Sequence, residues 1–487
     1  MKKHISKFII ALGFITVFSC GEEYLDINDS PNSATASVVT PDLILAGALK
    51  RAYDGHSATT NQLGNVFMYN WGANINSFSS GFVTEYSLDI DNTFYSTVWD
   101  NTYIRLANFQ NIITNEDPAY SNHKAIALIA KTFYMQYIVD LYGDAPYSQA
   151  WLGGANLYPA YDDDLTIYRS LYSNLEEAIT LINASTGSNP GNADIVFGGD
   201  MAQWERFANT LKLRLLVRES DATSADSQTY VASKMATLNS VEFLTTDVTI
   251  NPGYEATTDK QNPFWDRFFT TDGIATTTRQ FVVAGDYAMK YLNGSLTGVS
   301  DSRRERLYAP ASDGSYSGVI QGAVSSDPTT PSALSILGPG IIISASQDGY
   351  MMTASESYFL QSEAALNLSL TGDPKALFES GVEASFTLLG ADIGNYLASN
   401  QGWDASTNKL ETIMTQKWLA TNGLNAIESY IDYTRTGYPV IPLATTAQQS
   451  TKPFRLLYPS SELIGNSQNV PSQNTNSAYT TKVFWNE

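Results

Sequence analysis

The strongest constraint on the fold is a series of stretches in which apolar residues recur at helical spacing. In residues 165–182 an apolar side chain falls at every third or fourth position, so one stripe of a helix can be buried. The same pattern occurs in residues 124–141, 201–217, 355–370 and 374–389. Only Thr371-Gly372-Asp373 separates the last two stretches, and we expect Gly372 to end one helix and Asp373 to cap the next. The sequence therefore predicts an antiparallel helical hairpin here.

Such hairpins resemble tetratricopeptide units, which stack because one unit cannot bury its own apolar face. Their period along this chain is irregular, and two long stretches rich in Asn, Ser, Gly and aromatic residues interrupt it. Loops of this length usually are functional or carry small strands. We expect a mostly α fold in which irregular tetratricopeptide-like hairpins form one large body over residues 41–487. Pro41 opens its first helix, and loop insertions around residues 55–92 and 245–349 carry a few short strands.

The composition is that of an acidic globular protein. The 487 residues include 28 basic and 49 acidic side chains, a formal net charge of −21, which argues against nucleic acid as a partner. With 43% hydrophobic residues the chain can form a sizeable core. Three His and one Cys leave little for metal or thiol chemistry, and a single Cys excludes an intrachain disulfide.

The N-terminus has the features of a lipoprotein signal. Three lysines precede an apolar run at residues 8–18, which is shorter than the about 20 residues that span a bilayer. The only cysteine, Cys20, follows Ser19 at the end of that run, as in a bacterial lipobox. We expect residues 1–19 to be removed, Cys20 to be acylated and residues 20–40 to form a tether. The net charge of the mature chain is then 25 − 49 = −24. The acids that follow Cys20 look like the surface-export signal of Bacteroidetes lipoproteins.

An ordered series of motifs resembles the SusD/RagB family of nutrient-binding outer-membrane lipoproteins. The clearest is residues 137–147, which read YIVDLYGDAPY. Asp301-Ser302-Arg303 stands where the family usually has Asp-Pro-Arg. The other matches follow in family order over nearly the whole mature chain: residues 25–28, 31–32, 204–214, 356–363, 415–418, 435–439 and 455–459.

The resemblance implies a surface-exposed, lipid-anchored protein of the outer membrane that captures a glycan and delivers it to a SusC-like TonB-dependent transporter. In the family, ligand contacts typically come from the loop before the first tetratricopeptide-like helices and from the later insertion. Among glycans, the Trp and Asn content leads us to name a β-glucan such as laminarin. The alternative with the same scaffold is a peptide ligand, as in the RagB branch.

A third hypothesis, a surface glycoside hydrolase, needs two carboxylates that flank a scissile bond. The acids at residues 162–164 precede a helix, and Glu176-Glu177 lie on its polar face, so we expect both groups to be structural. His56 and His123 have no accompanying Gly-x-Ser-x-Gly elbow. We find no phosphate loop, dinucleotide fingerprint or metal cluster, and expect no enzyme activity and no cofactor. A calcium site built from scattered acids and carbonyls stays open.

A glycan site needs exposed aromatic rings for the C–H faces of sugars and amides for their hydroxyls. Trp99 and Trp204 lie on apolar helical stripes and should pack in the core, whereas the insertions combine rings with Asn. Arg303, Arg304 and Arg306 form the one basic patch that could offset repulsion of an anionic glycan. The predicted ligand-binding residues are Asn70, Trp71, Asn76, Phe78, Tyr86, Trp265 and Phe268.

Two further expectations concern packing. Arg214 and Arg218 lie on a predicted helix among apolar residues, and we expect them to snorkel or to pair with carboxylates. The polar C-terminal stretch from residue 440 carries Tyr458 and Trp485, which suggests that it docks back on the body.

Overall fold

The structure is a computed structural model that describes residues 39–184, 186–323 and 333–486. The predicted signal peptide, Cys20 and most of the tether lie outside the described residues. The first described helix, α2, begins at Pro41 as the sequence predicts. None of the helices in the described ranges is long and apolar enough to cross a membrane.

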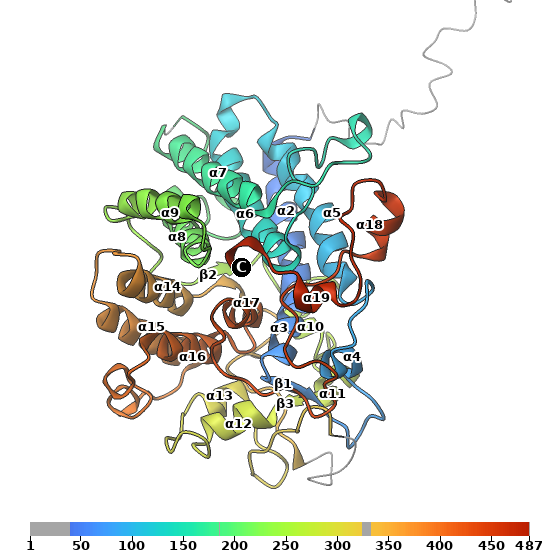
Figure 1. The fold of residues 1–487 in the computed structure, drawn as a ribbon, viewed down its shortest axis with the longest axis vertical. Coiled ribbons are helices and arrows are strands. Elements are labelled where there is room, and N and C mark those ends of the chain that lie inside the picture. The colour runs from blue at the N-terminus through green and yellow to red at the C-terminus, as the bar shows by residue number, and fades with distance from the viewer. Residues whose placement is uncertain (1–38, 185, 324–332, 487) are drawn as a thin grey trace, which may run out of the picture.

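Long helices form the upper and left parts of the molecule in Figure 1 and pack mainly on their neighbours in sequence. α5 packs on α6, α6 on α7 and α7 on α8, while α14 packs on both α15 and α16. A contact between α8 and α14 joins the two series. The long helices are α2 (Pro41–Gly55), α5 (Ser96–Ile113), α6 (Ser121–Tyr142), α7 (Asp164–Ala184), α8 (Met201–Glu219), α9 (Ala225–Leu238), α14 (Ala354–Asn367), α15 (Pro374–Leu389), α16 (Lys409–Thr421) and α17 (Ala426–Thr436).

This arrangement confirms the predicted mostly α, tetratricopeptide-like fold. All five stretches with helical periodicity form helices, and α14 and α15 form the predicted hairpin. Asp373 caps α15 by accepting a hydrogen bond from the Lys375 amide at 3.0 Å. The prediction for Gly372 is wrong, because α14 already ends at Asn367 and Leu368 follows as its cap. Gly372 instead takes a positive φ of 144° in the connecting turn.

The insertion at residues 55–92 is more helical than predicted. The α2 helix continues as a π-helix, η2 (His56–Thr60), and then as α3 (Asn61–Phe67), so the chain leaves the helix only before β1 (Trp71–Ala73). In its described residues the second insertion holds only short elements. These and the other short elements are α4 (Val83–Ser87), β2 (Val248–Ile250), α10 (Pro263–Asp266), α11 (Thr277–Phe281), β3 (Val282–Ala284), α12 (Asp286–Leu292), α13 (Arg304–Leu307), β4 (Gly349–Met352), α18 (Ser460–Gly465) and α19 (Ser477–Thr480).

Two antiparallel strand pairs fasten the insertions. β1 pairs with β3, with Trp71 opposite Ala284, and β2 pairs with β4, with Ile250 opposite Gly349. Single-turn 3-10 helices in the described part of the chain are η3 (Pro118–Tyr120), η4 (Gly153–Ala155), η5 (Gly191–Ala193), η7 (Tyr396–Ala398), η8 (Trp403–Ala405) and η9 (Phe484–Asn486). The few predicted short strands are therefore present.

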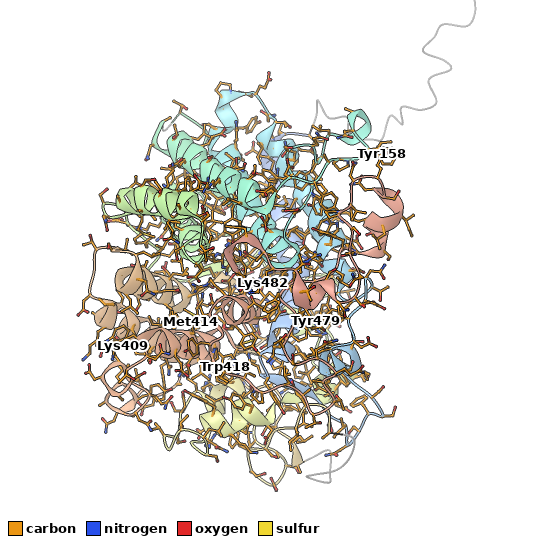
Figure 2. The ribbon with its side chains drawn as sticks, in the orientation of Figure 1. Tyr158, Lys409, Met414, Trp418, Tyr479 and Lys482 are labelled. Carbon is orange, nitrogen blue, oxygen red and sulfur yellow. The ribbon has the colours of Figure 1, made fainter. Side chains whose placement is uncertain are left out.

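Helix α6 forms the centre of the core. Nearly all of its residues are buried, and its apolar residues are spread around the helix rather than along one stripe, as expected of a helix in the interior. The C-terminal stretch docks against it as predicted: the Leu456 amide donates to the Leu141 carbonyl at 2.6 Å, and Trp485 is fully buried. Figure 2 shows side chains between the ribbons; among them, Trp418 of α16 donates from Nε1 to the Met68 carbonyl at 3.0 Å.

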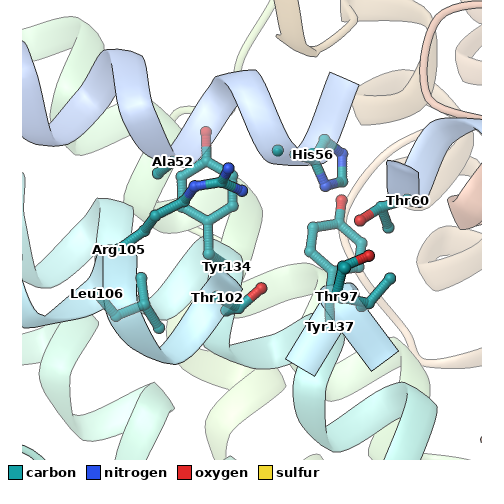
Figure 3. Close-up of a pocket in the computed structure, with 11 residues that line it drawn as sticks. Ala52, His56, Thr60, Thr97, Thr102, Arg105, Leu106, Tyr134 and Tyr137 are labelled. Carbon is teal, nitrogen blue, oxygen red and sulfur yellow. The ribbon is translucent and has the colours of Figure 1, made fainter. Parts of the chain in front are cut away.

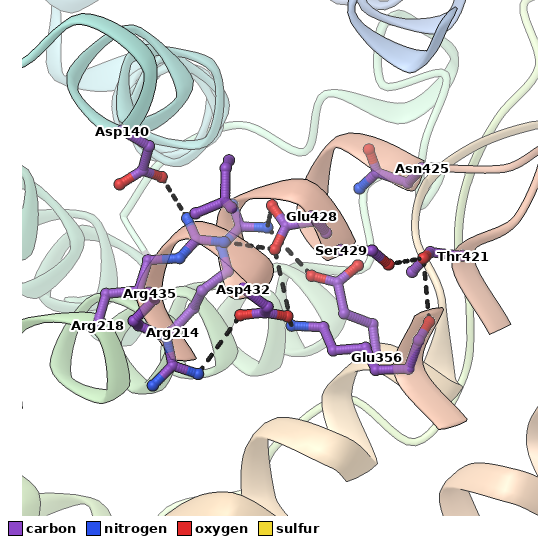
Figure 4. Close-up of polar contacts among 12 residues, drawn as sticks. Asp140, Arg214, Arg218, Glu356, Thr421, Asn425, Glu428, Ser429, Asp432 and Arg435 are labelled. Atoms are coloured by element: carbon purple, nitrogen blue, oxygen red, sulfur yellow. Dashed lines mark hydrogen bonds and ion pairs between the residues drawn. The ribbon is translucent and has the colours of Figure 1, made fainter. Parts of the chain in front are cut away.

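A network of buried charges links α6, α8, α14 and α17 (Figure 4). Arg214 of α8 donates from Nη1 to Glu428 at 3.0 Å and to Glu356 at 3.2 Å. Arg218, one turn further along α8, bonds both Asp140 of α6 and Glu428 of α17. These five side chains are essentially fully buried, so the expectation that Arg214 and Arg218 pair with carboxylates is confirmed.

The network extends along α17 through two more ion pairs. Lys417 of α16 lies 2.8 Å from Asp432, and Arg435 lies 2.7 Å from Glu363 of α14. Burial, and after it the adjacent Glu428 charge, raises the pKa of Glu356 to about 7, whereas the surrounding cations lower the pKa of Glu428. A buried charge is costly unless a partner of opposite sign is held close. The native packing of these helices supplies those partners.

Replacing Arg218 tests how far the packing depends on this network. Arg218→Met fills similar space but leaves Asp140 and Glu428 buried without this cation, so we expect the free energy of unfolding to fall by about 3–5 kcal/mol. Urea denaturation followed by circular dichroism measures the change.

The matched control is Arg206→Met on the same helix. Arg206 pairs only with Glu242, whose side chain is 74% exposed, so this substitution should cost less than about 1 kcal/mol. Equal losses in the two variants would contradict the role given to the buried network.

Candidate functional site

The structure brings the two insertions into contact. The β1–β3 pairing places residues 71–73 beside residues 282–284, and aromatic rings from both insertions meet around this pair. The Trp71 ring lies 6.2 Å from that of Phe264 and 6.5 Å from that of Phe268, measured between centroids. The rings of Phe78 and Phe281 are 5.2 Å apart. Residues that sequence analysis placed in two separate loops therefore share one region.

Most of the predicted ligand-binding residues in this region are core residues. Trp71 and Phe268 are each 0% exposed, and Tyr86 is buried with its hydroxyl accepting a hydrogen bond from the Ala73 amide at 2.9 Å. Asn70 is also buried, and its side chain donates to Asn65. These four residues cannot present a ring face or an amide to a ligand in this structure. The prediction of exposed contacts at these positions needs correction: Trp71 and Phe268 pack on each other across the two insertions, whereas Tyr86 and Asn70 are buried by contacts such as those with Phe82 and Asn65.

Four half-buried rings remain at the surface. Trp265 and Phe269 stack with centroids 4.4 Å apart and an interplanar angle of 20°. Phe78 meets Phe281 edge to face. We group these two ring pairs under the name α11 aromatic surface, because α11 links them. This helix contains Phe281, and its Arg279 guanidinium carbon lies 5.3 Å from the Phe269 ring centroid. Asn76 is half-buried in the turn that follows β1.

Local sequence fixes the position of Trp265. Pro263 starts α10 at its first position, and the Asn262 side chain accepts hydrogen bonds from the amides of Phe264 and Trp265 at 2.9 and 3.0 Å. A tight turn follows, in which the Thr270 amide donates to the Ile274 carbonyl at 2.9 Å. The Trp265 indole nitrogen is buried and has no acceptor among the described residues.

Two arginines lie at the edge of the α11 aromatic surface. Arg279 donates to the Leu337 carbonyl at 2.7 Å, and Arg267 donates to the Ala58 carbonyl at 2.9 Å. Burial lowers the pKa of both guanidinium groups, that of Arg279 to about 10. Within residues 39–184, 186–323 and 333–486 neither makes an ion pair with a carboxylate. Both remain cationic at neutral pH, because arginine keeps its proton there even when it is buried. The surface thus combines ring faces with hydrogen-bond donors.

Arg303, Arg304 and Arg306 do not form the predicted basic surface patch. Arg303 is fully buried and bonds Asp301 at 2.7 Å, while its guanidinium packs on the Phe386 ring. Arg304 pairs with Glu305, and Arg306 donates to the Leu389 carbonyl at 2.6 Å. The three arginines are close in sequence, and this spacing led to the prediction of a patch. In the structure the chain turns at α13, so their side chains contact different partners.

The two histidines in the described residues, His56 and His123, make structural contacts. His56 bonds the Asn425 side chain at 2.8 Å, and burial lowers its pKa to about 4, so it is neutral at physiological pH. His123 bonds Asp42 at 2.6 Å. A small cavity of about 20 Å³ lies beside His56 between α2, α5 and α6 (Figure 3). Its volume suits one water molecule rather than a sugar ring.

The acidic groups considered for hydrolysis also have structural partners. Asp163 accepts a hydrogen bond from the Thr166 amide, as expected of a helix cap, while Glu176 and Glu177 pair with Lys234 and Lys124. Asp144 has a carboxylate oxygen within 4.8 Å of those of Asp163 and Asp164. These oxygens accept backbone hydrogen bonds, among them one from the Phe484 amide to Asp164, and burial raises the pKa of Asp164 to about 6.

Two larger grooves lie away from the insertion aromatics. One of about 480 Å³ lies between α8, α9 and α14 and includes Phe243, and one of about 430 Å³ lies along α14 and α15 and includes Tyr358. Each includes one aromatic residue, compared with four rings on the α11 aromatic surface. Trp99 and Trp204 are buried, as predicted.

Comparisons with known proteins give a consistent picture of the fold. A family model for SusD-like proteins, described as starch-binding and associating with the outer membrane, matches residues 31–459. Among curated proteins none matches this chain.

Three solved structures illustrate the structural likeness. One is described as a chitin-binding protein; it is 26% identical with a TM-score of 0.74, and the alignment covers 92% of this chain and 100% of that chain. A chitin-binding SusD homologue from Flavobacterium johnsoniae is 22% identical with a TM-score of 0.74, over 91% and 98% of the two chains. A SusD homologue from Bacteroides vulgatus is 20% identical with a TM-score of 0.73, over 91% and 97%.

The different burial of the two insertion tryptophans predicts different effects on stability. Trp71→Ala removes a fully buried ring, and we expect the free energy of unfolding to fall by about 3–5 kcal/mol. Trp265→Ala removes a half-exposed ring and should cost clearly less. Denaturation of both variants by urea gives the comparison, and a larger loss for Trp265→Ala would contradict this assignment of core and surface.

Proposed function

The chain belongs to the SusD-like family, and on that premise we propose that it binds oligosaccharides through the α11 aromatic surface. The observation that carries this proposal is the group of four half-exposed rings from the two insertions. A sugar ring presents apolar C–H groups that pack on an aromatic face, while its hydroxyls need hydrogen-bond partners. Arg279 beside Phe269 offers N–H donors for these hydroxyls.

Binding without chemistry is the mode that the residues support. The described carboxylates and histidines that sequence analysis considered for catalysis are engaged in caps, ion pairs and core contacts. Two of the solved relatives are described as chitin-binding. We infer that the ligand leaves the protein with its covalent bonds unchanged.

For the glycan class, chitin-type oligosaccharides are the first to test. The solved structure at 26% identity is described as chitin-binding, whereas the choice of laminarin rests on composition alone. Isothermal titration calorimetry with chito-oligosaccharides, laminari-oligosaccharides and peptide mixtures compares these classes. We expect heat with a glycan, and heat with peptides alone would instead favour the RagB-type alternative.

Substitutions of aromatic residues test whether the oligosaccharide binds at the α11 aromatic surface. Replacing Trp265 and Phe269 together by Ala removes one stacked pair, and we expect affinity to fall by about 10–100-fold, since aromatic contacts contribute about 0.5–1.5 kcal/mol each. Phe243→Ala is the matched control, because this half-buried ring lines a groove between α8, α9 and α14. Unchanged affinity in the double variant, or an equal loss in the control, would contradict the α11 site.

We further propose that Cys20 carries a lipid anchor and that the protein hands its ligand to a SusC-like TonB-dependent transporter. The lipobox-like sequence and the family membership support both proposals. Cys20→Ser should move the protein from the membrane fraction to the soluble fraction. When the anchored protein is purified from native membranes, a large outer-membrane barrel protein should co-purify with it. Retention of Cys20→Ser in the membrane, or an absent barrel, would contradict the respective proposal.

A further inference from the structure

A polar groove of about 190 Å³ lies between α2 and α5, on the helical body rather than in the insertions. Two α2 residues, Arg51 and Asp54, form one wall. The other wall comes from α5 and consists of Asn101, Ile104, Arg105 and Asn108. We call this the α2–α5 groove. Neither the insertions nor the α11 aromatic surface contributes to its lining.

The α5 wall is a stripe of polar side chains on one helix face. Asn101, Arg105 and Asn108 are spaced by four and three residues, so they lie one above the other. A helix face that only packs against a neighbour would carry apolar residues at this spacing. Across the described ranges, the structure gives these three side chains no hydrogen bond with another residue. Their donors face a groove that protein atoms do not fill.

Arg105 is held in the groove by the shape of its surroundings. The guanidinium group packs so closely on Gly55 that a Cβ atom there would lie 1.4 Å from Arg105 Nη1. Figure 3 shows the Arg105 side chain extending from α5 toward α2, with the Tyr134 side chain beside it. The Tyr134 hydroxyl is buried and has no partner among the described residues. Burial of the guanidinium lowers the pKa of Arg105.

The charge balance in the groove is positive although the chain is acidic. Asp54 is its one acidic lining residue, and Lys50 already binds Asp54 Oδ2 at 2.7 Å. Arg51 and Arg105 make no ion pair within the described part of the chain. Arg206 and Arg304, by comparison, pair with Glu242 and Glu305, whereas Arg267 and Arg279 donate to backbone carbonyls. The α2–α5 groove thus holds two guanidinium groups that make no ion pair, although the nearby Asp54 charge acts on Arg105.

We propose that the α2–α5 groove binds a sugar unit that carries a carboxylate, such as a hexuronate. The planar Arg105 guanidinium matches a carboxylate with two parallel hydrogen bonds, and Arg51 adds a second positive charge at the exposed rim. The Asn101 and Asn108 amides offer donors and acceptors for the hydroxyls of the sugar ring. This site goes beyond the proposed function, because it recognises charge at a place separate from the α11 aromatic surface.

Calorimetry of the full protein with trigalacturonate as the probe tests the proposal. We expect measurable binding that weakens as NaCl is raised, because a partly exposed ion pair is screened by salt. Maltotriose is the neutral counterpart and should bind this groove at least tenfold more weakly. A tripeptide with a free C-terminal carboxylate tests whether the charge alone is enough, and equal affinity for this tripeptide would overturn the assignment to a sugar.

Variants connect the binding to the groove. Arg105→Gln should lower trigalacturonate affinity at least tenfold, and Arg105→Lys, which keeps the charge but loses the planar fork, should also bind more weakly than the native protein. Asn101→Ala with Asn108→Ala gives a second test that leaves Arg105 in place. The controls are Arg206→Gln, a paired arginine elsewhere, and Trp265→Ala on the α11 aromatic surface, and neither should change the affinity.

Three results would overturn the proposal: no binding of trigalacturonate to the native protein, unchanged affinity in Arg105→Gln, or loss of affinity in Trp265→Ala. The two sites can be tested independently, because Trp265→Ala changes only the α11 aromatic surface. If no oligosaccharide binds at that surface, the trigalacturonate measurements on the α2–α5 groove still hold. Thermal unfolding of each variant confirms that altered binding does not come from a loss of fold.

Discussion

The buried charges on α6, α8, α14, α16 and α17 are the constraint on which the structure depends. Apolar contacts alone would allow neighbouring helices to slide by a turn, but a buried arginine must meet its carboxylate at one position. Arg214 and Arg218 sit at the centre and reach Asp140, Glu356 and Glu428 from three other helices. Helices far apart in sequence are thereby fixed relative to one another.

The same residues explain why the family motifs predict the fold but not the ligand. Asp140 lies in the motif at residues 137–147, Arg214 in 204–214 and Glu356 in 356–363. Lys417 and Arg435 belong to two further motifs and join the network through Asp432 and Glu363. The motifs thus describe the interior of the helical body. The rings of the α11 aromatic surface lie outside these motifs, in the insertions.

Sequence reasoning predicted the helices well because each periodic stretch buries a stripe, a property that is local in the chain. It failed at Trp71 and Phe268, since their burial depends on contacts between residues about 190 or more apart, which no local pattern contains. The basic patch at residues 303–306 failed for the same reason. The Asn101–Arg105–Asn108 stripe was missed, although three polar residues on one face of an otherwise amphipathic helix were visible as a signal.

The central claim is that buried ion pairs hold the helical body in one arrangement, and that this body presents one ligand surface built from both insertions. Hydrogen exchange measured by mass spectrometry, with and without the oligosaccharide that binds most tightly, tests this claim most directly. The account predicts that ligand slows exchange in residues 74–82 and 262–281 together, while α6 and α8 are already protected without ligand. Slower exchange only along α14 and α15, or fast exchange of α6 and α8 in the unliganded protein, would contradict it.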